Sequence, residues 1–128
     1  YHGKTRLVWM YPMSANIVEG SFFQPLQDAI MKSKMATKFF APWKGFEFVK
    51  DLVDQEYRGG RVIAASDFSA TDAHFQLAAS MQVCDVLEQC FSPTYREGLR
   101  HSIEQMHAIP LVIGEDSKIT GTHGVSSG

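Results

Sequence analysis

The spacing of hydrophobic positions along the chain predicts helices in its middle and later parts. Apolar residues recur on one helical face over 46–57, and Gly59-Gly60 then ends the helix. These face residues are Phe46, Val49, Val53 and Tyr57. A longer helix is predicted over 72–91, with Leu77, Met81, Cys84, Leu87 and Phe91 facing inward. Ser92-Pro93 breaks it, and a further helix is predicted over 95–107.

A less regular helix is predicted near the start of the chain. We expect it to begin at Ser14 or Asn16, because Asn16 and Glu19 have the spacing of a capping box. Gly20 and Pro25 make the pattern irregular and leave open either a single helix or two short ones.

Short apolar runs between the helices predict strands. One such run covers 5–10, and another, over 61–66, is typical of a buried strand. A hairpin is predicted near the end of the chain, with strands over 109–113 and 118–122 and a turn over 114–117. Together these elements predict an α+β or α/β domain in which a small sheet carries helices on one side.

Composition and charge leave several classes of function open. The chain has 128 residues, 45% of them hydrophobic, which is enough for the core of one domain. Its formal net charge is -2, so the total charge does not indicate a nucleic-acid binder. Basic residues still gather over 32–44, where Phe39, Phe40 and Trp43 suit either stacking on bases or packing into a core.

Other features narrow the class of protein. No run of about 18 apolar residues predicts a membrane span. Cys84 and Cys90 fall on different faces of a predicted helix, which favours two reduced core thiols over a disulfide or a metal clasp. The histidines lack metal-ligand spacing, and we interpret them as surface or core residues. Because the chain starts at Tyr1 and stops after Ser-Ser-Gly, we expect a piece of a longer protein.

Two carboxylates follow the apolar run over 61–66. Asp67 comes at its end, and Asp72 lies five positions further on. Hard cations such as Mg²⁺ prefer carboxylate oxygens, so Asp67 is a candidate metal ligand. Asp72 is a candidate acceptor for a ribose 2′-OH, the group that distinguishes RNA precursors from DNA precursors. On spacing alone, a turn role for Asp67 and a helix-capping role for Thr71 or Asp72 stay open.

The two ends of the chain carry candidate phosphate-binding groups. Lys4 and Arg6 occupy alternate positions of the first predicted strand, so they point to one side and suit a triphosphate. The segment 121–128 is rich in Gly and Ser, and its backbone N–H groups can come close to a phosphate or a base. Exposed surface charges and a flexible tail are the alternatives.

In their order along the chain, these segments resemble three motifs of viral RNA-dependent RNA polymerases. Gly3-Lys4-Thr5-Arg6 resembles motif F of the fingers, and Asp67-Phe68-Ser69-Ala70-Thr71-Asp72 resembles motif A. Gly124-Val125-Ser126-Ser127-Gly128 resembles the opening of motif B. The amino-acid sequences of 2–30 and 67–75 are most similar to those of picobirnavirus-type enzymes. The resemblance covers essentially the whole chain.

The resemblance implies a partial right-hand polymerase, with a fingers-derived segment over 1–60 and a palm portion over 61–128. Such an enzyme adds nucleotides from NTPs to an RNA 3′ end on an RNA template, with two Mg²⁺ or Mn²⁺ ions. Asp67 would then be the catalytic metal ligand. The implied nucleotide-binding residues are Lys4, Arg6, Asp72, Ser127 and Gly128.

The resemblance also sets expectations for the complete protein. Motif C, a Gly-Asp-Asp hairpin with further metal carboxylates, is expected after Gly128, so this piece alone should be inactive. Template RNA, nascent RNA and NTPs are the expected partners, with capsid association in the full virus. The virion and the host cytoplasm are the expected locations.

Two other classes of protein compete with this interpretation. One is a reverse transcriptase-like palm enzyme, against which Asp72 argues because DNA-making enzymes tend to exclude the 2′-OH. The other is a non-enzymatic RNA-binding domain. It would explain the basic and aromatic segment 32–44 but not the order of the three motifs.

Overall fold

The computed structural model describes residues 10–34 and 36–125. This part of the chain is mostly helical and holds one small antiparallel sheet, so the α+β prediction is confirmed at that level. Contacts divide the chain into two compact units. The hairpin unit comprises Tyr1–Phe22 and Ser69–Gly128, and the connector unit comprises Phe23–Phe68. The assignment of fingers over 1–60 and palm over 61–128 stays a prediction.

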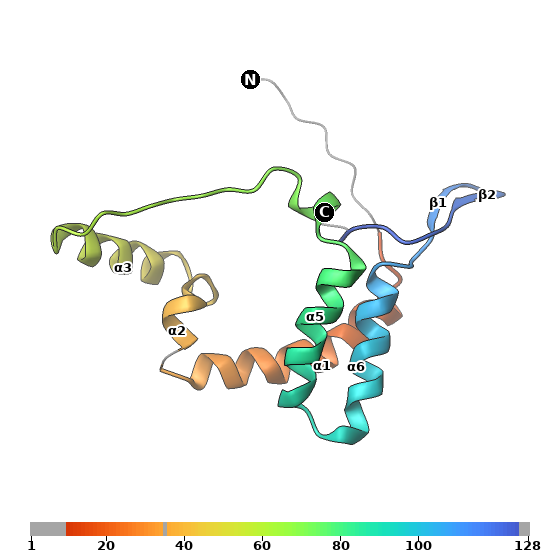
Figure 1. Ribbon diagram of the computed structural model, residues 1–128, viewed down its shortest axis with the longest axis horizontal. Coiled ribbons are helices and arrows are strands. Elements are labelled where there is room, and N and C mark those ends of the chain that lie inside the picture. The colour runs from red at the N-terminus through yellow and green to blue at the C-terminus, as the bar shows by residue number, and fades with distance from the viewer. Residues whose placement is uncertain (1–9, 35, 126–128) are drawn as a thin grey trace. The chain divides into compact units, whose positions relative to one another are not determined.

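The longest helix, α1, covers Met13–Lys32 as one element (Figure 1). The predicted helix is therefore present and the alternative of two short helices is wrong, although Pro25 lies inside α1 and removes one backbone donor. The predicted capping box is wrong as well, because Asn16 lies inside the first turn. The amides of Ala15 and Asn16 instead donate to the carbonyl oxygen of Pro12, at 3.0 and 3.3 Å.

Two short helices precede a longer one in the connector unit. α2 covers Ala36–Phe39, the 3₁₀ helix η1 covers Ala41–Lys44, and α3 covers Phe46–Arg58. The predicted helix over 46–57 is thus confirmed. Gly60 follows it with a φ of 74°, a backbone conformation that glycine adopts without steric cost.

The predicted buried strand over 61–66 is wrong. These residues are exposed and form no regular secondary structure. A strand requires a hydrogen-bonded neighbour, and the sheet found among the described residues contains β1 and β2 alone. The apolar run suggested a buried strand, but the described chain holds no partner strand that could pair with these residues and bury them.

The hairpin unit is built on two helices that lie side by side, α5 over Leu77–Leu87 and α6 over Pro93–Met106 (Figure 1). The 3₁₀ helix η2, Glu88–Cys90, connects them. The helix predicted over 95–107 is confirmed. The one predicted over 72–91 is interrupted, because a separate turn, α4 over Thr71–His74, precedes α5.

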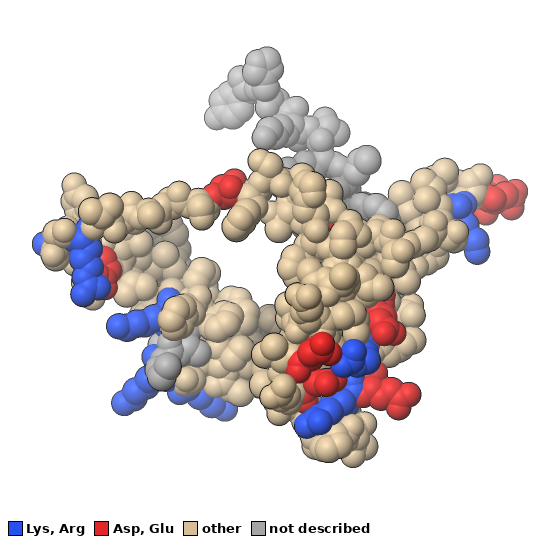
Figure 2. Space-filling model, viewed as in Figure 1, with Lys and Arg blue, Asp and Glu red and all other residues tan. Residues whose placement is uncertain are grey.

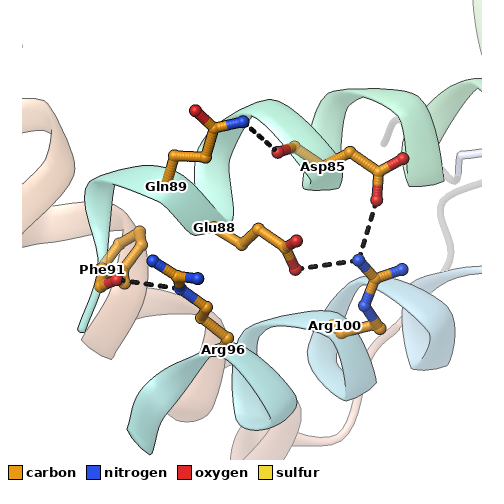
Figure 3. Close-up of polar contacts among 6 residues, drawn as sticks. All are labelled: Asp85, Glu88, Gln89, Phe91, Arg96 and Arg100. Carbon is orange, nitrogen blue, oxygen red and sulfur yellow. Dashed lines mark hydrogen bonds and ion pairs between the residues drawn. The ribbon is translucent and has the colours of Figure 1, made fainter. Parts of the chain in front are cut away.

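Packing and charge both hold α5 against α6. Cys84 of α5 and Leu99 of α6 are buried. Figure 3 shows Arg100 extending from α6 to two carboxylates, with its Nη2 2.8 Å from both Asp85 Oδ1 and Glu88 Oε2. Hydrogen bonds to Asp85 and then to Glu88 raise the pKa of the Arg100 guanidinium and favour its charged form.

A short hairpin follows α6. β1, Leu111–Gly114, pairs antiparallel with β2, Ser117–Ile119, so the predicted hairpin is confirmed with shorter strands. Beyond it, the chain returns to the helices. The amide of His123 donates to the carbonyl oxygen of His107 at 2.9 Å, and the amide of Val125 donates to that of Phe75 at 3.3 Å.

The two cysteines are free thiols with different surroundings. Cys84 is buried, whereas Cys90 is exposed, so the prediction of core thiols is right for the first and wrong for the second. Burial raises the pKa of the Cys84 thiol and favours its neutral form. Among the helices of the described chain, none has the length and apolar character to cross a membrane.

Candidate functional site

The predicted site residues divide into two groups. Lys4, Arg6, Ser127 and Gly128 lie outside the described residues, whereas Asp67 and Asp72 lie within them. Asp67 belongs to the connector unit and Asp72 to the hairpin unit. That their two carboxylates share one cleft stays a prediction.

Asp67 lies in the exposed, irregular segment that follows α3. The expected position at the tip of a buried strand is therefore wrong for the described chain. Its carboxylate forms no hydrogen bond or ion pair with any residue that the structure describes. An exposed carboxylate of this kind is accessible to a cation from solvent.

Asp72 is half-buried in the single turn of α4. Its Oδ1 accepts a hydrogen bond from the amide of Ala73 at 3.0 Å. Neither Thr71 nor Asp72 is the N-cap of α4. That position belongs to Ala70, which has a φ of 50° and a ψ of 44°, a left-handed conformation that residues with a side chain rarely adopt.

The first residues of the segment resembling motif B, Gly124 and Val125, lie against the chain at and just after Asp72. Gly124 is so close to the α4 backbone that a Cβ there would overlap the carbonyl oxygen of Asp72 and lie 3.2 Å from the carbonyl carbon of Ala73. The hydrogen bond from the Val125 amide to the carbonyl oxygen of Phe75 extends the contact beyond the end of α4. Glycine is required at 124 because any side chain would separate the two backbones.

A buried histidine fixes the residue that precedes Gly124. His107, at the C-terminal end of α6, is 0% exposed. Its Nδ1 lies 2.7 Å from the carbonyl oxygen of His123, and its Nε2 lies 2.6 Å from Ser80 Oγ. Because a carbonyl can only accept, Nδ1 donates to His123, and Nε2 forms the second hydrogen bond of the ring with the Ser80 hydroxyl.

The ring of His123 also contacts backbone carbonyls. Its Nδ1 lies 2.7 Å from the carbonyl oxygen of Gly124, and its Nε2 lies 3.0 Å from that of Ile109. The sequence analysis interpreted both histidines only as surface or core residues, and His107 is a core residue. No local signal could have identified their hydrogen bonds, because the partners come from α5, the end of α6 and the chain beyond β2.

The connector unit carries a second candidate surface, which we call the basic surface. Exposed lysines occupy it, as Figure 2 shows around α2 and η1. They are Lys32, Lys34, Lys38 and Lys44. Phe40 and Trp43 stack on each other with ring centroids 4.9 Å apart, while Phe39 is 82% exposed. Trp43 also packs edge-on against Phe23, with ring centroids 5.8 Å apart, so among the described residues Phe40 and Trp43 pack against neighbouring rings whereas Phe39 does not.

Comparisons with known proteins give the family. The family model described as viral RNA-dependent RNA polymerase matches residues 2–128. The chain is 27% identical over 129 residues to a protein of Human picobirnavirus (strain Human/Thailand/Hy005102/-) named "Potential RNA-dependent RNA polymerase". That match covers 98% of this chain and 23% of the relative, so the chain spans less than a third of the relative's length. No solved structure matches the chain. Because the family model matches almost all of its residues, the chain belongs to the viral RNA-dependent RNA polymerase family.

Proposed function

We propose that this chain is part of an RNA-directed RNA polymerase that adds nucleotides from NTPs to the 3′ end of a growing RNA. Family membership supports the class of enzyme. The observation that carries the proposal furthest is the backbone contact between Gly124 and Asp72. It brings the segments that resemble motifs A and B together, as a shared nucleotide pocket would require.

Asp67 is the proposed metal ligand. In phosphoryl transfer, bound Mg²⁺ or Mn²⁺ ions neutralise charge on the transferring group and align the attacking and leaving oxygens. An accessible carboxylate fits this role, because Mg²⁺ commonly binds one or two carboxylates and keeps waters and substrate phosphates as its other ligands. The part of the chain that the structure describes has no cluster of three acidic, His or Cys groups. Asp67 would therefore act with ligands from elsewhere in the whole polymerase.

Asp72 is the proposed reader of the sugar. Its carboxylate is held in the first turn of α4 by the Ala73 amide, which limits the directions from which it can accept a further hydrogen bond. A 2′-OH donating to it would favour ribonucleotides over deoxyribonucleotides. Ser127 and Gly128 would line the same pocket, and Lys4 and Arg6 would contact the triphosphate.

The remaining parts of the proposal concern the RNA and the virus. The basic surface suits a single strand, since lysines attract phosphates and exposed aromatic rings stack on bases. Association with the capsid, and a location in the virion and the host cytoplasm, follow from the class of virus and stay proposals.

Template-directed incorporation by the complete polymerase tests the proposed function. A primed RNA template is offered NTPs or dNTPs with Mg²⁺, and a matched DNA template is offered the same substrates. RNA-templated incorporation of NTPs is the expected result. Preferential incorporation of dNTPs would favour the reverse transcriptase-like alternative, and RNA binding without any incorporation would favour the non-enzymatic one.

A further inference from the structure

The most completely buried polar side chain of the hairpin unit has no part in the proposed chemistry. His107 is fully buried, yet a histidine in a core is costly unless its nitrogens are hydrogen-bonded. Both ring nitrogens have partners, on α5 and on the chain beyond β2. The placement of those partners suggests what the residue does.

Residue 123 is held at both of its backbone polar groups. Its amide donates to the carbonyl oxygen of His107 at 2.9 Å, and its carbonyl oxygen accepts from His107 Nδ1 at 2.7 Å. One residue therefore fixes the peptide planes on either side of His123. The next residue along the chain is Gly124, whose backbone contacts Asp72.

Ser80 sets the orientation of the His107 ring. Its Oγ lies 2.6 Å from His107 Nε2 and is itself in a buried residue of α5, so the imidazole cannot rotate without leaving a buried hydroxyl unpaired. The salt bridges of Arg100 hold α5 and α6 together at a separate point. The position of the ring is thus fixed by the helix pair.

We propose that His107, oriented by Ser80, is a positioning residue for the nucleotide pocket. It acts through the backbone of His123 and holds Gly124 against Asp72, which keeps the Asp72 carboxylate in position for the sugar of the incoming nucleotide. This inference rests on the proposed function, since it concerns the same pocket. It assigns a kinetic role to a side chain that does not touch the substrate.

Two substitutions of His107 separate the two hydrogen bonds of its ring. The side-chain amide of asparagine reaches approximately where Nδ1 lies, so His107→Asn keeps a donor for the His123 carbonyl. The longer glutamine reaches approximately where Nε2 lies, so His107→Gln keeps the Ser80 contact and loses the side-chain hydrogen bond to the His123 carbonyl. The backbone hydrogen bond from the His123 amide to the carbonyl oxygen of residue 107 remains in both variants. Both replace a buried ring with a smaller amide, which makes their effects on folding comparable.

The test measures single-nucleotide incorporation by the complete polymerase, with melting temperature measured alongside. For His107→Gln we expect an NTP KM raised roughly 10-fold and a reduced preference for ribonucleotides over deoxyribonucleotides. His107→Asn should stay within about 3-fold of the wild type in both quantities. If both variants lose melting temperature but retain the wild-type KM and sugar preference, His107 is only a core residue and the proposal is overturned.

A milder variant covers the case in which His107→Gln does not fold. Ser80→Ala removes the hydroxyl that orients the ring, and we expect a smaller change in KM and sugar preference in the same direction. Wild-type values of both in Ser80→Ala would overturn the proposal. A wild-type polymerase that incorporates no nucleotide on RNA would instead reject the proposed function, and this inference would fall with it.

Discussion

Gly124 lies against the backbone of Asp72 so closely that the chain has no room for a Cβ at position 124. The two residues come from segments far apart in the sequence, one resembling motif A and the other motif B. Their contact depends on the absence of a side chain on one partner. It ties the geometry of a candidate nucleotide pocket to a single glycine.

Gly124→Ala should therefore move the motif B segment away from α4. Forcing a methyl group into a closed backbone contact typically costs about 1–3 kcal/mol, and we expect RNA synthesis to fall by at least about 10-fold. Gly20→Ala is the matched control, because a Cβ at that position of α1 meets no atom within 4 Å. It should raise stability by about 0.5–1 kcal/mol. Equal activity in the two variants would show that the contact is not needed.

Asp72→Asn should separate sugar reading from structural support. The asparagine side chain can still accept from the Ala73 amide, so we expect little change in melting temperature. Losing the charged acceptor for the 2′-OH should narrow the ribonucleotide preference by roughly 10-fold. Incorporation of matched ribo- and deoxyribonucleotides measures that ratio. An unchanged ratio with a lowered melting temperature would leave Asp72 only its role in α4.

The stability of the hairpin unit should depend on the ionisation of Glu19. This residue lines a pocket of about 310 Å³ between α1 and α6, which His101 also lines, and burial raises the pKa of its carboxyl from 4.5. The folded chain therefore binds more protons than the unfolded chain just above pH 4.5. This contribution to stability is present below that pH and is lost as the pH rises through the raised value.

Glu19→Gln removes the titrating group, so its advantage in melting temperature over the wild type should be largest at neutral pH and should shrink toward pH 4.5. Melting curves across that range measure the difference. Glu97→Gln, an exposed position on α6, is the control and should follow the wild type. A constant difference between Glu19→Gln and the wild type at every pH would contradict the expectation.

The basic surface should contribute to RNA affinity in a salt-dependent way. Each lysine that neutralises a phosphate releases counterions, so replacing Lys38 and Lys44 by Ala should reduce the slope of log affinity against log salt by about 0.7 per residue on single strands. Lys50→Ala is the control, because Lys50 already lies 3.6 Å from Glu47 on α3. If all three substitutions give the same slope as the wild type, this surface does not bind RNA.

Local patterns predicted α3 and α6 well, because a helix forms its hydrogen bonds within its own segment and its period is visible in the sequence. The segment 61–66 was predicted wrongly for the opposite reason. A strand depends on a neighbour elsewhere in the chain, and an apolar run says nothing about whether that neighbour exists. Pro25 similarly suggested a break that the rest of α1 does not show.

The candidate site could be predicted only in part from the sequence. Motif order related Asp72 to the Gly124–Gly128 segment, and the structure adds the backbone contact between Gly124 and Asp72 that the order alone could not specify. The hydrogen bonds among Ser80, His107 and His123 could not be predicted. The three residues come from separate segments, and their spacing along the chain does not suggest that they are in contact. Asp67 is a candidate because of its position after an apolar run and stays a prediction, since the strand expected there is absent from the described chain.

Asp67→Ala in the complete polymerase gives the most direct test of the account. If Asp67 binds the metal that serves the transition state, RNA synthesis should be abolished while the melting temperature stays close to that of the wild type. Asp51→Ala, an exposed aspartate of α3 in the same unit, should retain normal synthesis. Elongation by Asp67→Ala at the rate of the Asp51→Ala control would contradict the assignment of the catalytic metal site to this chain.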